Sequence, residues 1–128
     1  MTAAELLEVV RQAVAATVAV ETAGHDAPAE VTATPAVVLR PANPWLVPNR
    51  SIGGCVQVIW QVQLIAGRYD LASSFGQLGE GYVAARDALL GAGVGQIGPL
   101  GELAPTEVAS VPMLSAIFIV TLPFDPGD

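Results

Sequence analysis

Apolar positions recur with two different periods along this chain, one typical of helices and one of strands. The first helical set is spaced by three and four residues: Leu6, Val9, Val10, Ala13, Val14 and Thr17. With Thr2 and Glu5 at capping-box spacing, it predicts a helix over about residues 3 to 16. The second helical set follows Asp70, a candidate N-cap: Leu71, Phe75, Leu78, Tyr82, Ala85 and Leu89. It predicts a helix that ends near Leu90, with Gly91 as the C′ residue.

Strand-like alternation predicts four strands, over residues 36–39, 55–66, 107–111 and 113–122. In the second of these strands, apolar residues at even positions alternate with a row that contains Gln57, Gln61 and Gln63, which indicates a second face that is only partly wet. Both rows of the last strand are largely apolar, as in a central or doubly covered strand. Pro112 indicates a bulge or an edge break just before it.

Three segments without periodicity separate these elements. Residues 22–35 predict a loop, residues 41–54 a proline-rich turn or arm with Trp45 at its middle, and residues 91–105 a glycine-rich loop. The order of elements predicts an α+β fold in which a mostly antiparallel sheet of about four strands carries two helices on one face. We expect a single domain spanning residues 1–128.

Composition narrows the function. Hydrophobic residues make up 52% of the 128 residues and charged residues only 13%, about half the usual share. Such a chain has few charges to cover its surface, which favours burial against copies of itself or a partner. The net charge is −7, and the five cationic residues are arginines scattered along the sequence, which argues against gripping nucleic acid by its phosphates.

Cysteine content and hydropathy bear on the compartment in which the protein is expected. One cysteine, Cys55, allows no intrachain disulfide, which suits a reducing compartment. The acidic N-terminus does not resemble a signal peptide, and no apolar run approaches the ~20 residues that a membrane span needs. We therefore expect no membrane contact.

The string GVGQIG, residues 93–98, fits the G-x-G-x-x-G pattern of a dinucleotide-binding turn. That turn requires a strand before it, a helix after it and an acidic residue about 20 positions on. Here a helix precedes it, Pro99 and Gly101 follow, and Met113 stands at the acidic position. We interpret the segment as a mobile link between the second helix and the last strands, ordered only when a neighbour arrives.

Other candidate chemistry is sparse. His25 is the only histidine and Cys55 the only cysteine, so one chain cannot build a zinc site of the usual nitrogen and sulfur ligands. Glu80 and Asp87 share one side of the second helix about two turns apart, where they form either a solvated face or an acidic lining of a channel. We predict no catalytic, cofactor-binding or metal-binding residue, and hence no enzyme.

Trp45 is the strongest candidate for contact with another molecule. Asn43-Pro44 and Pro48-Asn49 flank it, and an aromatic residue on a stiff arm either folds back on its own sheet or anchors in a neighbouring subunit. The candidate interface residues are Trp45, Leu46, Arg50, Gly93, Gly95 and Gly98.

Three stretches resemble the tail terminator (tail-completion) proteins of long-tailed bacteriophages. They are PAVVLRP (35–41), CVQVIWQVQLIAGRYDLASSFGQLGEGYVAARDALL (55–90) and VASVPMLSAIFIVTLPF (108–124). The resemblance covers nearly the whole chain and lies in architecture and texture, since the family has no tight motif.

The resemblance implies an α+β subunit of a ring, usually a hexamer, at the head-proximal end of the tail. Such a ring stops tube growth, binds the tail-tube protein and the head-neck connector protein, and lets DNA pass through its hole as cargo. The protein would assemble in the host cytoplasm and reside in the tail or neck of the virion. A head-tail connector (neck) protein of the same virion, a small ligand-binding or enzymatic domain, and a non-viral oligomeric binding module stay open as alternatives.

Overall fold

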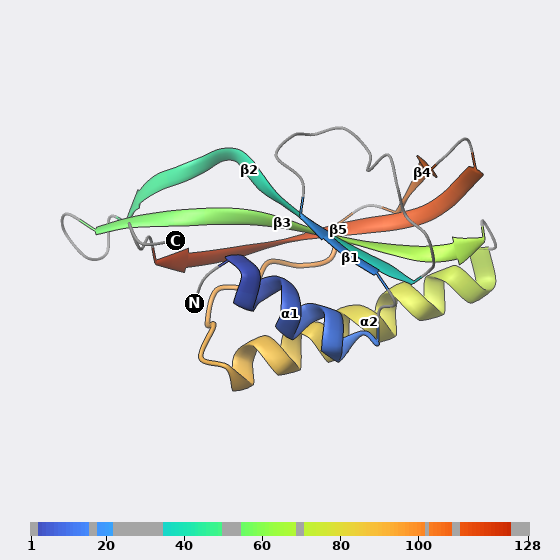
Figure 1. Ribbon diagram of the computed structural model, residues 1–128, viewed down its shortest axis with the longest axis horizontal. Coiled ribbons are helices and arrows are strands. Elements are labelled where there is room, and N and C mark those ends of the chain that lie inside the picture. Colours follow the sequence, from blue (N-terminus) through green and yellow to red (C-terminus); the bar gives the residue numbers. More distant parts are fainter. Residues whose placement is uncertain are drawn as a thin grey trace.

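The computed structural model describes residues 3–15, 18–21, 35–49, 55–68, 71–101, 103–108 and 111–123. Its elements are, in chain order, α1 (Ala3–Ala13), β1 (Val18–Glu21), β2 (Ala36–Asn49), β3 (Cys55–Arg68), α2 (Leu71–Gly91), β4 (Ala104–Val108) and β5 (Val111–Pro123). One curled sheet has both helices on the same face (Figure 1), so the α+β prediction is confirmed.

The strand order in the sheet is β1-β2-β3-β5-β4. The last four strands in this order pair antiparallel with their neighbours, as the sequence predicted. β1 is an addition: it pairs parallel with residues 36–39 of β2 at the edge of the sheet. β1 has only four residues, VAVE, and such a short segment shows no alternation that would distinguish a strand from a continuation of the preceding helix.

The hydrophobic core lies between the helices and the sheet. Cross-strand neighbours Leu39, Val62 and Phe118 form a fully buried row on the helix-facing side of three adjacent strands. Leu6 and Val10 of α1 pack against the same core, together with buried residues of α2: Leu78, Ala85 and Leu89. The alternation in β3 and β5 places these rows, since every second side chain of a strand points to one face.

The two helices differ from their predicted bounds in informative ways. α1 ends at Ala13, before the predicted residue 16, and Ala15 follows with a φ of 53°. Thr2, the candidate cap, lies outside the described residues. On α2 the prediction that Phe75 faces the core is wrong: Phe75 is exposed and Ser74 is buried. Ser74 stands four residues before Leu78 and therefore lies on the same buried row of the helix.

The prediction of an arm over residues 41–54 is wrong for residues 41–49, which continue β2 and pair with β3 at residue 41 and at residues 46–49. Residues 50–54 lie outside the described residues. The register shifts between Pro41 and Leu46, around a cis bond between Asn43 and Pro44. Beyond residue 39, no described strand pairs with the other side of β2. Proline lacks the N–H that a second neighbour would need, so an edge strand or a bulge is where it fits. The prolines thus mark an edge strand.

A register shift also lies near the predicted irregularity at Pro112, but on the neighbouring strand. It falls between Ile65 and Arg68 of β3, whereas Pro112 itself pairs in register with Glu107 of β4. The predicted bulge is therefore wrong at Pro112, whereas the predicted edge position fits, because Pro112 stands one residue before Met113, the first residue of β5 that pairs with β3.

Candidate interaction surfaces

The outward face of α2 presents large apolar side chains. Phe75 is 64% exposed, Leu90 51% and Val83 45%, although the outer face of a surface helix is usually polar. Gly76 and Gly79 are also exposed and lie among these side chains at helical spacing. We call these five residues the outer stripe of α2.

The two glycines of the outer stripe are not required by packing inside the subunit. A Cβ atom added to Gly76 or Gly79 would have no described atom within 4 Å, yet each glycine costs a helix about 1 kcal/mol relative to alanine. Gly81 differs, because its added Cβ would lie 3.5 Å from Cγ1 of Val14 and 3.8 Å from Cδ1 of Leu64. The outer stripe thus combines exposed apolar side chains with two glycines that packing within the described residues does not require.

A second exposed apolar surface lies where the last residues of β2 pair with the first residues of β3. Trp45 is 50% exposed, Leu46 38% and Val56 36%. Leu46 pairs with Val58, two residues from Val56, so Leu46 and Val56 are diagonal neighbours on one face. We call these three residues the Trp45 patch. Trp45 and Leu46 were both predicted as interface residues, and the structure places Val56 diagonally beside Leu46.

A cavity of about 300 Å³ lies between the end of α1, the first half of α2 and the ends of β2 and β3 that are distant from the Trp45 patch. Its lining is mainly apolar and includes Val14, Leu64, Ala66, Leu78, Gly81 and Ala84. Two exposed polar side chains, Gln77 and Glu80, also line it. No pattern in the sequence predicted this cavity, because its walls come from four elements.

The glycine-rich segment ends α2 and then follows β5. Gly93 has a φ of 91°, its N–H donates to the carbonyl of Leu90, and the N–H of Val94 donates to the carbonyl of Leu89. This is the Schellman pattern, with Gly93 as the C′ residue, two positions after the predicted Gly91. Val94 is buried beside Leu89, as the motif requires.

After Val94 the same segment is attached along the edge of β5. The N–H groups of Gly98 and Gly101 donate to Ile119 and Ile117 at 2.7 and 2.8 Å, and the hydroxyl of Tyr82 donates to the carbonyl of Gly98 at 2.8 Å. The interpretation of this loop as a mobile link is therefore wrong for the subunit as described. Gly93 and Gly98 have roles within the chain, while Gly95 is exposed with open space around it.

On the sheet face away from the helices, a buried polar row crosses four strands. The guanidinium of Arg40 on β2 donates to the side-chain oxygen of Gln63 on β3, whose amide donates to Oγ of Ser115 on β5 at 3.2 Å. The Ser115 hydroxyl donates to the carbonyl of Ala104 on β4, also at 3.2 Å. These side chains are at most 5% exposed. The row joins the strands by side-chain hydrogen bonds on a face that was predicted to be only partly wet.

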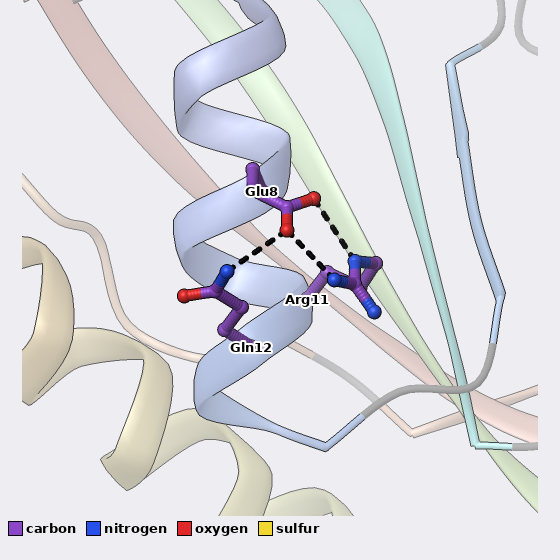
Figure 2. Close-up of polar contacts among 3 residues, drawn as sticks. All are labelled: Glu8, Arg11 and Gln12. Atoms are coloured by element: carbon purple, nitrogen blue, oxygen red, sulfur yellow. Dashed lines mark hydrogen bonds and ion pairs between the residues drawn. The ribbon is translucent and has the colours of Figure 1, made fainter.

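The acidic residues singled out on α2 are exposed in the subunit. Glu80 and Asp87 both have exposed side chains, and Asp87 forms a salt bridge with Arg86 at 3.1 Å. On α1, Figure 2 shows Glu8 accepting hydrogen bonds from Arg11 at 3.0 and 2.7 Å and from Gln12 at 2.9 Å. These bonds, chiefly that from Arg11, lower the pKa of the Glu8 carboxyl below its ordinary value. Such exposed pairs stabilise little.

Two further features concern the described residues, namely metal-binding groups and membrane-spanning helices. They contain no group of three or more histidine, cysteine or acidic side chains placed to hold a metal ion. No described helix has the length and apolarity that crossing a membrane requires. Arg50 and His25 lie outside the described residues, and Cys55 is the first residue of β3.

No protein-family model matches the sequence, and no match is found among curated proteins.

Proposed function

We propose that this protein is a subunit of a ring that terminates the tail of a long-tailed bacteriophage. The ring would sit at the head-proximal end of the tail tube, stop its growth and join the tail to the neck. The proposal combines the sequence resemblance with the distribution of exposed apolar residues over the subunit.

The observation that supports it best is the presence of two separate apolar surfaces, the outer stripe of α2 and the Trp45 patch. A head-to-tail contact between copies uses two different surfaces of each subunit, and it closes into a ring when the rotation permits. A two-fold dimer needs only one self-complementary surface. Two surfaces on different elements therefore favour the ring.

The charge of the chain fits a ring through which DNA passes. Arg11 and Arg86 are each engaged with a carboxylate, and Arg40 is buried. With a net charge of −7, the subunit repels a DNA backbone and does not grip it. We infer that DNA is cargo and not a ligand.

Two measurements test the proposal. Light scattering after gel filtration and negative-stain electron microscopy should show closed rings of the purified protein. Added during polymerisation of the tail-tube protein from the same genome, the protein should bind one tube end and shorten the tubes. A monomer at every concentration that leaves tube length unchanged would contradict the proposal, whereas rings that bind only the neck connector would identify a neck protein.

A further inference from the structure

The cavity between α1, α2 and the sheet has the size and lining for one large side chain. At about 300 Å³ it is at the small end of the range for ligand sites, where drug-sized molecules bind. On the α2 side of the cavity, the small residues Gly81 and Ala84 leave space, and Leu64 and Leu78 supply apolar surface. Glu80 adds a carboxylate, a hydrogen-bond acceptor, beside this apolar lining.

Trp45 has the matching properties. It is half exposed, it follows Pro44 in an edge strand, and Pro48 lies three residues further on, so its backbone has little freedom to lose on binding. Tryptophan is the residue type most typical of interface anchors, and its indole N–H seeks an acceptor when it is buried. The indole thus complements an apolar cavity that has a carboxylate at its side.

The cavity of the same chain is out of reach for Trp45. Leu46, the next residue, pairs with Val58, whereas the cavity-lining residues Leu64 and Ala66 lie roughly 20 Å or more further along β3 at about 3.3 Å per residue. A tryptophan that enters this cavity must come from another molecule, and every copy of this chain presents one.

We propose that Trp45 of one subunit inserts into the cavity between α1 and α2 of the next, with its indole N–H donating to Glu80. The inference rests on the proposed ring and names one contact within it, which does not include the outer stripe of α2. The two halves of the contact lie at opposite ends of β2 and β3. Each subunit can therefore give its tryptophan to one neighbour and receive a tryptophan from another. The contact is head-to-tail, and the angle between its halves sets the number of subunits.

Two single variants block the contact from opposite sides. Trp45→Ala removes the anchor, and Ala84→Leu fills the cavity with a residue that favours helices. Truncating an interface anchor should weaken self-association about 30-fold or more. Ala88→Leu, one turn further along α2 and away from the cavity lining, is the matched control and should assemble like the wild type.

Mixing the two blocked variants gives the decisive result. Each variant alone should be monomeric, but the intact Trp45 of Ala84→Leu can enter the intact cavity of Trp45→Ala. The mixture should therefore form a 1:1 heterodimer and no larger species. Circular dichroism and melting of each variant establish that both are folded before they are mixed.

A fluorescence readout covers the case in which Ala84→Leu does not fold. The chain has two tryptophans, so Trp60→Phe leaves Trp45 as the only one. Its emission should shift to the blue as this variant assembles, and Glu80→Ala should weaken that assembly.

The outcomes separate the contact from the function. If wild type and Trp45→Ala form the same rings, or if the mixture stays monomeric while Ala88→Leu assembles, the Trp45 contact is refuted and the ring proposal stands. If the wild type itself never assembles, both are refuted.

Discussion

Replacing Gly76 and Gly79 together by alanine should make the isolated subunit more stable. Both residues lie on the exposed face of α2, and an added Cβ would have no described atom within 4 Å. The new methyl groups therefore meet no obstacle, and the main effect is the better helix propensity of alanine.

The size of the effect follows from the length of the chain and the number of sites. Glycine is about 0.8–1.0 kcal/mol less favourable than alanine in a helix interior, so the double change should stabilise the subunit by about 2 kcal/mol. Unfolding entropy is about 2.1 cal/mol/K per residue, or about 0.27 kcal/mol/K for 128 residues. The melting temperature should therefore rise by about 7 °C.

Urea unfolding followed by circular dichroism measures this change, at several protein concentrations so that assembly can be separated from subunit stability. The midpoint should rise while the slope m stays constant. Gly101→Ala is the opposite control, because its Cβ would lie 3.1 Å from the backbone oxygen of Ile117 and should destabilise. A lower midpoint for the double variant at all concentrations would refute an open outer face of α2. Weaker assembly of the stabilised subunit would place another backbone against the outer stripe.

Three further changes test the loop and the second face of the sheet. Gly93→Ala should cost about 1 kcal/mol or more, since a φ of 91° strains any other residue; urea unfolding checks this, with the exposed helical Gly91→Ala as a control that should not destabilise. Tyr82→Phe should cost about 1 kcal/mol through the lost hydrogen bond to Gly98 and speed amide exchange there; unchanged exchange would contradict the attachment of the loop. Gln63→Leu should lower the stability by about 2 kcal/mol, because Arg40 and Ser115 each lose a hydrogen bond to the Gln63 amide in a buried site. A melting temperature equal to that of the wild type would show that the polar row does not stabilise the fold.

Prediction from the sequence worked best where the pattern was long and local. The alternation in β3 is twelve residues long, and it identified Val62 and Leu64 as buried and the glutamine row as partly wet. On α2 the same method misplaced Phe75. A step of four residues from Leu71 reaches Phe75 and a step of three reaches Ser74, and both steps fit a helical pattern. The packing of the first turn of α2 in the folded protein selects Ser74 as the buried residue.

Proline was the main source of error along β2. Three prolines within residues 41–48 indicate a break in any local reading, because proline cannot donate to a ladder. The structure tolerates them because β3 lies on only one side of this stretch. Whether a strand is an edge strand depends on the other strands, and no local pattern contains that information.

Among the candidate interface residues, Trp45 and Leu46 were predicted from their position among prolines, and both are exposed. The exposure of the outer stripe of α2 was not predicted, although Phe75, Val83 and Leu90 stand at helical spacing in the sequence. Their spacing is helical, but exposure of that face follows only once the opposite face, with Leu78 and Leu89, has been assigned to the core.

The sequence by itself determined the fold class, the position of both helices and the faces of β3 and β5, because these depend on side-chain periods within one element. Only the tertiary structure decided the attachment of the glycine-rich segment to β5, the cavity above Gly81 and the buried row from Arg40 to Ser115. Each of these joins residues from several elements, through hydrogen bonds or packing across distances in the chain that no period spans. The outward position of Phe75 belongs with them, since a helix has an outer face only once something covers its inner one.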